Sequence, residues 1–251
     1  MMATTLPNGF SAISLGVVCP LANEESSAVR FVKEVLNQCA AFGFRSTTFF
    51  AVLDNASRDR TRELLEELQT TERRLQVVWA PENRCVVDAY VRGYREALQA
   101  GCDWILEIDA GFSHQPENIP LFFEKMSEGY DCVFGSRFCP GGRITESSHA
   151  REFLSRAGTT ITNALMGTEL KDMTSGFELF SRAALERVLA KGIESRSHFF
   201  QTEIKIHCRD LKIVEVPIHY RAASNSVNRR VITDSLSNLW RMYRHQKQRS
   251  Q

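Results

Sequence analysis

The sequence has no long apolar segment and no leader-like start. No stretch approaches the roughly 18 to 20 apolar residues that a membrane-spanning helix needs. The opening residues, MMATTLPNGFSAISLGVVCPL, lack the basic start and the long apolar core of a secretory signal. We therefore expect a cytoplasmic chain without a transmembrane segment.

An excess of charge of one sign and paired cysteines are also missing. Basic residues number 31 against 30 acidic ones, a net charge of +1, so the overall charge does not predict a nucleic-acid partner. The seven cysteines are odd in number, and none forms a Cys-x-x-Cys pair. They predict buried thiols in a reducing compartment rather than a disulfide framework or a zinc site.

Two common phosphate-binding glycine motifs are absent. The chain has no Gly-x-Gly-x-x-Gly and no Gly-x-x-x-x-Gly-Lys-[Ser/Thr]. This argues against a dinucleotide oxidoreductase and against a P-loop nucleotidase. A nucleotide site would have to be built from other residues.

Apolar runs of strand length alternate with helix-like segments in the first half of the chain. This alternation is typical of right-handed βαβ units. We predict one α/β domain over residues 12–228, with a mainly parallel central sheet flanked by helices. A flexible arm (1–11) precedes it, and a basic amphipathic helix and tail (229–251) follow. The expected strands are 13–19, 47–53, 75–79, 103–108, 131–136, 174–180 and 212–216, and later helices are expected near 150–166, 182–190, 199–209 and 231–246.

Three of the expected strands end in residues suited to a ligand site, Pro20, Asp54 and Asp109. The carboxyl ends of parallel strands meet at one edge of a sheet, where open α/β sheets bind ligands. Two carboxylates there can hold a nucleotide and a divalent cation, because hard cations choose oxygen ligands. The alternative is that each Asp only caps the turn after its strand.

Short motifs then follow one another in a fixed order between residues 13 and 226. They are Pro20-Leu21-Ala22-Asn23-Glu24, Leu53-Asp54-Asn55-Ala56-Ser57-Arg58-Asp59, Gly93-Tyr94-Arg95, Asp109-Ala110-Gly111, Ser113-His114-Gln115-Pro116-Glu117, Gly135-Ser136-Arg137-Phe138, Thr174-Ser175-Gly176-Phe177, Phe200-Gln201-Thr202-Glu203 and Glu215-Val216-Pro217. Together they resemble the GT-A glycosyltransferases of family 2, and within these the dolichol-phosphate or polyprenyl-phosphate mannose synthases. The resemblance implies a GT-A fold. It also implies inverting transfer of a sugar from GDP-mannose or a UDP-sugar to a polyprenyl or dolichyl phosphate.

The resemblance also implies roles for individual residues. Asp109 would hold Mg²⁺ or Mn²⁺ and, with Ala110, meet the diphosphate. Arginine suits phosphate because its planar fork binds two oxygens at once. The nucleotide pocket would be lined by Pro20, Glu24, Leu53, Asp54 and Asn55, the acceptor phosphate would face Arg137 and Arg151, and the donor diphosphate would face Arg221.

The acceptor decides whether the reaction needs a base. A lipid phosphate, with a second pKa of about 6, is already a nucleophile at neutral pH. A soluble hydroxyl acceptor, as in natural-product or glycan biosynthesis, would need a general base, for which Glu203 or Asp172 is the candidate. A third possibility is a relative that binds nucleotide without catalysis.

Several positions depart from the family's pattern. Ala22 stands in place of an aromatic residue, and Asn55 in place of the second Asp of an Asp-Asp pair. Gly111 replaces the second Asp of Asp-x-Asp, the Gln or Ser that follows is Ser113, and Val227 replaces a closing lysine. With one charged ligand lost, we expect the cation to bind weakly without nucleotide.

The last expected helix combines apolar and basic side chains. Trp240 and Tyr243 fall among Arg241, Arg244 and Lys247. Such a helix can lie on an anionic membrane surface, or it can pack its apolar side on the domain and leave its charges in water.

Overall fold

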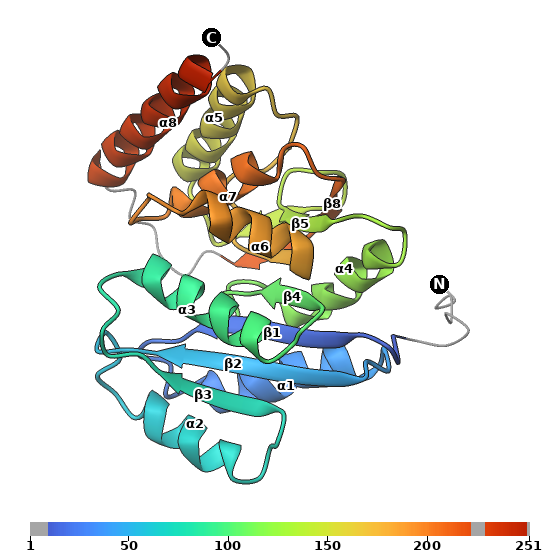
Figure 1. Ribbon diagram of the computed structural model, residues 1–251. Helices are drawn as coiled ribbons and strands as arrows, with labels where there is room; N and C mark the ends of the chain where they lie inside the picture. The colour runs from blue at the N-terminus through green and yellow to red at the C-terminus, as the bar shows by residue number, and fades with distance from the viewer. Residues whose placement is uncertain (1–9, 222–228, 250–251) are drawn as a thin grey trace.

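The computed structural model describes residues 10–221 and 229–249 (Figure 1). The strands are β1 Ser14–Pro20, β2 Ser46–Leu53, β3 Leu75–Trp79, β4 Trp104–Glu107, β5 Cys132–Ser136, β6 Arg143–Thr145, β7 Glu178–Ser181, β8 Ile213–Pro217 and β9 His219–Arg221. The α-helices are α1 Ala28–Ala40, α2 Thr61–Gln69, α3 Val86–Gln99, α4 Ile119–Met126, α5 His149–Met166, α6 Arg182–Lys191, α7 Phe200–Cys208 and α8 Arg229–Arg249. The main sheet has the order β3-β2-β1-β4-β7-β5-β8, and β6 pairs with β9 in a second sheet. The predicted α/β domain with a mainly parallel sheet is confirmed.

Helices cover both faces of the main sheet because its central strands are apolar on both faces. In β1, Leu15 and Val17 belong to the core under α1 and α4, whereas Val18 belongs to the core under α3. Continuous apolar strands of this kind are typical of parallel sheets covered on both sides. Gly93 lets α3 approach closely, since a Cβ there would collide with Val18 and touch Val52.

One predicted strand is shorter than expected and runs in the opposite direction. The expected strand 174–180 begins only at Glu178, and β7 is antiparallel to both β4 and β5. Residues 174–176 form a loop instead, because their backbone groups form hydrogen bonds with side chains rather than with a neighbouring strand. Asp172 accepts a hydrogen bond from Thr174 N (3.1 Å), and Lys205 donates one to Ser175 O (2.6 Å).

Two further predictions concern the start of the domain and the position Val227. Phe10, expected in the flexible arm, is buried and stacks on Phe42 and Phe44, so the ordered domain begins earlier than predicted. Residues 1–9 and 222–228, which include Val227, lie outside the described residues.

All seven cysteines are free thiols, and six of them are buried, as predicted.

The helix α8 lies beside α5, away from β2 and β3 (Figure 1). Leu239 of α8 is buried in a small apolar cluster with Met166 of α5 and with Met173, Phe199 and Ile206. The expected packing of this helix on the domain is therefore confirmed for Leu239. Leu236 and Trp240 of the same helix stay exposed.

Candidate active site

The carboxyl ends of three neighbouring strands meet at one edge of the sheet. β1 lies between β2 and β4 and runs parallel to both. The segments after Pro20, Leu53 and Glu107 therefore leave the sheet on the same side. Asp54 follows β2 directly, and Asp109 is the second residue after β4. The predicted meeting of these strand ends is confirmed.

Asn23 ties the loop after β1 to the loop after β2. Its backbone N–H donates to Ser57 Oγ (3.1 Å), and its side chain donates to Ala56 O (3.1 Å) and accepts from Arg58 N (2.9 Å). Its backbone is left-handed, with φ 59°, a conformation that Asn adopts more readily than most residues. A residue of the first motif thus fixes the turn of the second.

Asp59 organises the other side of the same loop. Its carboxylate accepts hydrogen bonds from Thr61 N (3.0 Å), Thr61 Oγ1 (2.6 Å) and Glu25 N (2.9 Å). Although desolvation acts to raise it, these hydrogen bonds, above all that from the Thr61 hydroxyl, lower the pKa of Asp59 to about 2. The carboxylate is therefore ionised at any physiological pH and holds the loop in one conformation.

Asp54 and Asn55 are partly engaged within the loops. Asp54 accepts from Ala56 N (2.8 Å) and from the Asn83 side chain (3.4 Å). Asn55 donates to Pro81 O (2.9 Å) and is exposed. One oxygen of Asp54 thus caps the turn after its own strand, as the alternative interpretation expects. The other oxygen lies toward the loop after β3.

Asp109 is positioned by two ring side chains from other parts of the chain. Tyr90 of α3 donates a hydrogen bond to Oδ1, and His114 Nδ1 lies 3.4 Å from Oδ2. Burial, together with the Asp109 charge, raises the pKa of Tyr90, which therefore remains a donor. Burial, opposed by the Asp109 charge, lowers the pKa of His114 to about 4, so its imidazole is neutral at pH 7. The Asp109 side chain itself is 41% exposed.

Gly111 and Phe112 turn the chain sharply after Asp109. Both have left-handed backbones, with φ 74° and 59°, and such a conformation in a bulky residue is typical of functional sites. The Phe112 ring packs edge-on against Phe31 of α1 (5.1 Å), and the Arg30 guanidinium lies 4.5 Å from its centroid. The turn is thereby anchored to α1.

The surroundings of Gly111 allow a test of whether a divalent cation fits. A Cβ on Gly111 would lie 2.6 Å from Glu24 Oε1 and 3.1 Å from Oε2. Glu24 and Asp109 thus bring two carboxylates to this turn. Within residues 10–221 and 229–249, no group of three or more His, Cys, Asp or Glu side chains is placed to hold a metal on its own. The donor set fits a cation that arrives with a diphosphate, since phosphate oxygens complete the coordination.

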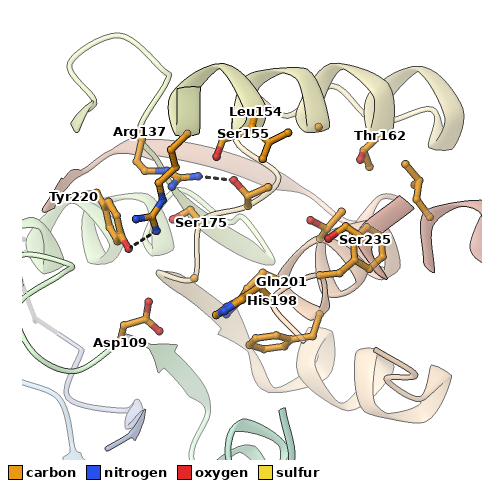
Figure 2. Close-up of a pocket in the computed structure, with 18 of the residues that line it drawn as sticks. Asp109, Arg137, Leu154, Ser155, Thr162, Ser175, His198, Gln201, Tyr220 and Ser235 are labelled. Atoms are coloured by element: carbon orange, nitrogen blue, oxygen red, sulfur yellow. Dashed lines mark hydrogen bonds between the residues drawn. The ribbon is translucent and has the colours of Figure 1, made fainter. Parts of the chain in front are cut away.

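A cavity of about 720 Å³ opens beside Asp109 and extends between α5, α7 and α8 (Figure 2). Its Asp109 end is polar, with His114, Arg137 and Tyr220 in the wall. Asp109 is the one carboxylate among the described residues that line it. Apolar side chains from α5, α7 and α8 also line it, among them Ile161, Phe199, Leu236 and Leu239.

Arg137 lies in the cavity wall with its charge already balanced. Its guanidinium donates two hydrogen bonds to Asp172, each 2.7 Å long, and both side chains are buried. Although burial acts to raise it, the Arg137 guanidinium lowers the pKa of Asp172 to about 2. A carboxylate so occupied is a poor proton acceptor, which contradicts the expectation that Asp172 could serve as a base.

Arg151 of α5 also lines the cavity, beside Tyr220. Its Nη2 lies 3.4 Å from Tyr220 Oη, and its guanidinium lies 5.9 Å from the Tyr220 ring centroid. Tyr220 is held beside Asp109 because β9 bridges to His114 and donates from Arg221 N to Ser113 O (2.8 Å). The two arginines expected at the acceptor phosphate therefore both line the cavity.

A second cluster of buried charge lies beside the cavity floor. Glu107 and Glu178 are opposite each other on β4 and β7, and both are buried. Lys205 of α7 donates to Glu178, while Tyr94 and Gln201 donate to Glu107. One ammonium thus faces two carboxylates. Burial, with the charge of Glu178, raises the pKa of Glu107, and burial raises that of Glu178 to about 7.

Among the predicted site residues, Asp109, Arg137 and Arg151 line the cavity, and the others, which include Glu203 and Arg221, lie outside its lining. Glu203 is buried, and its two oxygens accept from Glu194 N and Ser195 N, both at 2.9 Å. Its carboxylate is therefore engaged in holding a turn, and its role as a base stays a prediction. Arg221 pairs with Glu146 at 3.0 Å and is about half exposed, and its role at the donor diphosphate stays a prediction.

Some residues of the site were not predicted from the sequence. Tyr90, which holds Asp109, and Gln201, which lines the cavity and holds Glu107, belong to this group. The signal that could have found Tyr90 is its spacing from Tyr94, since residues four apart share one face of a helix. This spacing does not distinguish a site residue from a core residue, because a tyrosine also fits the buried apolar face of an ordinary helix.

Comparisons with known proteins agree with this geometry. The family model described as glycosyl transferase family 2 matches residues 16–189. An undecaprenyl-phosphate mannosyltransferase of Micrococcus luteus is 32% identical over 171 residues, 67% of this chain and 70% of that protein. A polyprenol monophosphomannose synthase of Mycolicibacterium smegmatis is 28% identical over 207 residues, 81% of this chain and 76% of that protein.

A solved structure is similar in fold. It is glucosyl-3-phosphoglycerate synthase of Mycobacterium tuberculosis in complex with Mn²⁺, UDP-glucose and phosphoglyceric acid. The TM-score is 0.64 at 18% identity, over 90% of this chain and 77% of that one. The same synthase is also known with Mg²⁺ and UDP. At this identity the likeness concerns the fold alone, and it confirms the predicted architecture.

Proposed function

The chain belongs to glycosyl transferase family 2, and on that premise we propose that it moves a hexose from a nucleotide sugar to the phosphate of a polyprenyl acceptor, with inversion at the anomeric carbon. The proposal rests above all on the cavity, whose lining combines Asp109, Arg137 and Arg151 with apolar side chains such as Ile161, Leu236 and Leu239. A phosphate attached to a hydrocarbon chain has the same two-part character. The names of the two bacterial relatives support the same acceptor class.

The donor nucleotide is assigned to the loops at the carboxyl ends of β1 and β2. These loops are held in place by Asn23 and Asp59, which leaves the neighbouring residues ready to bind without reordering. The residues that we assign to the nucleotide and its diphosphate are Pro20, Glu24, Leu53, Asp54, Asn55, Ala110 and Arg221.

A divalent cation, Mg²⁺ or Mn²⁺, would be held by Asp109 and by the diphosphate. When bound, it would neutralise the charge that develops on the departing nucleoside diphosphate. Tyr90 orients Asp109 for this role by donating to one oxygen, and His114 Nδ1 lies 3.4 Å from the other.

The acceptor phosphate is assigned to Arg137 and Arg151, which both line the cavity. Arg137 also pairs with Asp172 and lies 5.4 Å from the Tyr220 ring centroid. No second carboxylate is found among the described lining residues. This favours a phosphate acceptor over a hydroxyl acceptor, because a phosphate dianion needs no base.

Apolar side chains exposed on α5 and α8 suggest how a lipid would be reached. Phe153 and Ile161 of α5 and Leu236 and Trp240 of α8 are the large apolar side chains exposed on these helices among the described residues. Basic residues of α8 lie on the same helix. Such a surface suits peripheral contact with an anionic membrane, which we include in the proposal. In the described part of the chain, no helix has the length and apolarity to span a bilayer.

The proposal is tested with purified protein, Mn²⁺ or Mg²⁺, GDP-mannose and UDP-sugars, and three acceptors: polyprenyl phosphate, the polyprenol of equal length, and a water-soluble sugar. We expect nucleotide release and glycolipid formation with polyprenyl phosphate alone. Asp109→Asn should lower the rate at least about a hundredfold. Transfer to the soluble acceptor alone would support the alternative activity. A folded protein that turns over none of these donors would contradict the proposal.

A further inference from the structure

The turn after Asp109 has no carboxylate of its own at position 111, but the space beside that position is occupied. Gly111 carries no side chain, and the space next to its Cα is filled by the carboxylate of Glu24. A Cβ on Gly111 would lie 2.6 Å from Oε1, 3.1 Å from Oε2 and 3.2 Å from Cδ of Glu24. The whole carboxylate of Glu24 thus lies where the side chain of an aspartate at position 111 would begin.

Glu24 is held in this place by its own surroundings. The Ser27 hydroxyl donates to Oε2, and Glu24 N donates to Thr61 Oγ1 (2.7 Å). Burial, followed by the charges of Asp109 and Glu24, raises the pKa of the Cys19 thiol. The carboxylates of Asp109 and Glu24 therefore converge on the end of β1 from two different loops.

A second feature of the turn points to a ligand. His114 is buried, it lines the cavity, and its Nδ1 has no hydrogen-bond partner, although it lies 3.4 Å from Asp109 Oδ2. A small shift of Asp109 would complete this hydrogen bond, and apo sites often tighten in this way when they bind. Tyr90 and His114 therefore flank Asp109, whose side chain is 41% exposed.

We propose that Glu24 supplies the second carboxylate of the cation site, in place of the side chain that is lost at Gly111. The inference rests on the proposed function, because the cation is expected to arrive with a nucleoside diphosphate. It changes the role of Glu24, which the family resemblance places only in the nucleotide pocket. Two carboxylates bind Mg²⁺ or Mn²⁺ more tightly than one, because ligand charge sets the affinity for hard cations.

The two roles of Glu24 predict different binding data. We would measure binding of GDP and of UDP by calorimetry, with Mn²⁺ and with EDTA, and binding of Mn²⁺ to the protein–nucleotide complex by electron paramagnetic resonance. Glu24→Gln should weaken nucleotide binding at least about tenfold with Mn²⁺ and leave it unchanged in EDTA. Loss of a contact to the nucleotide alone would weaken binding equally in both conditions. Glu25→Gln is the matched control and should bind like wild type.

A carboxylate exchange gives an independent test. Gly111→Asp alone should lose Mn²⁺ affinity, because its Cβ and charge meet Glu24. The double variant Glu24→Ala, Gly111→Asp should recover most of that affinity, since aspartate tolerates the left-handed backbone at this position. Two results would overturn the inference while nucleotide still binds: unchanged Mn²⁺ affinity in Glu24→Gln, or no recovery in a folded double variant. Failure of the wild-type chain to bind either nucleotide would overturn the proposed function and this inference together.

Discussion

The two clusters of buried charged residues near the cavity differ in their ratio of basic to acidic side chains. Arg137 and Asp172 form a one-to-one pair with two hydrogen bonds of 2.7 Å. In the other cluster, Lys205 faces both Glu107 and Glu178, and Glu178 Oε2 has no hydrogen-bond partner. A matched pair can stay charged when buried, whereas two carboxylates that share one cation must hold a proton between them. The first cluster should therefore be insensitive to pH near neutrality, and the second sensitive to it.

The largest effect is expected when the matched pair is broken. Asp172→Asn leaves Arg137 buried without its counter-charge and should lower the free energy of unfolding by about 3–5 kcal/mol. The pKa of Asp172 is about 2, below that of a free Asp. Its stabilisation is thus present above about pH 4 and is lost as the pH falls through 2. The loss in Asp172→Asn should therefore be the same at pH 5 and pH 8 in urea unfolding.

A surface pair supplies the control for that measurement. Glu66→Gln breaks the exposed ion pair with Arg62 and should change stability by no more than about 1 kcal/mol. A loss in Asp172→Asn as small as this would contradict the view that the matched pair is a strongly coupled unit.

Removal of the shared cation should give a smaller, pH-dependent effect. Lys205→Met takes away the charge that lowers the pKa of both Glu107 and Glu178. At pH 8 we expect a loss of about 3 kcal/mol. At pH 5 the loss should be less, because protonated carboxyls need no counter-charge. Equal losses at the two pH values would show that the two clusters respond alike, contrary to the comparison.

Glu178→Gln should remove part of the pH dependence of the wild type. The pKa of Glu178 is raised to about 7 in the folded state, against about 4.3 when unfolded. The folded chain thus holds more protons between these values, and its stability falls as the pH rises through this window. We expect the fall between pH 4.5 and pH 7 to shrink by about 1–2 kcal/mol in the variant. Thermal unfolding across this range measures it, and an unchanged profile would place the titration on another group.

The smallest effect is expected at Glu203, whose carboxylate is satisfied by backbone N–H groups. Glu203→Gln keeps one acceptor oxygen and should cost about 1 kcal/mol of stability, the value of a single hydrogen bond. Transfer to polyprenyl phosphate should proceed at the wild-type rate, because Glu203 does not line the cavity. A large drop in rate with unchanged stability would support Glu203 as a base.

The sequence predicted the strand ends of the first half better than the loops of the second half. The strands of the first half are local apolar runs, and their carboxyl ends meet because the parallel pairing leaves no other arrangement. Pro20, Asp54 and Asp109 could therefore be placed at one edge from the pattern alone. The loop 174–176 could not, because Asp172 and Lys205 hold its backbone groups from outside the segment.

The same limit explains why the hydrogen-bond partners of Asp172 and Glu203 were not predicted. A carboxylate in a sequence does not reveal whether its oxygens will meet a guanidinium, a backbone N–H or solvent. Arg137 lies 35 residues from Asp172 in the chain. Contacts at that separation depend on the whole fold and are not written in a local pattern.

The last helix, α8, closes one side of the cavity through Ser235, Leu236 and Leu239, yet it contributes no strand to either sheet. A terminal segment of this kind can diverge without disturbing the residues that bind the sugar nucleotide. Under the proposed function, substitutions in this one helix should change the preference for acceptor chain length and leave nucleotide binding unchanged. Grafting α8 from a relative with a shorter lipid substrate should transfer that preference along with it.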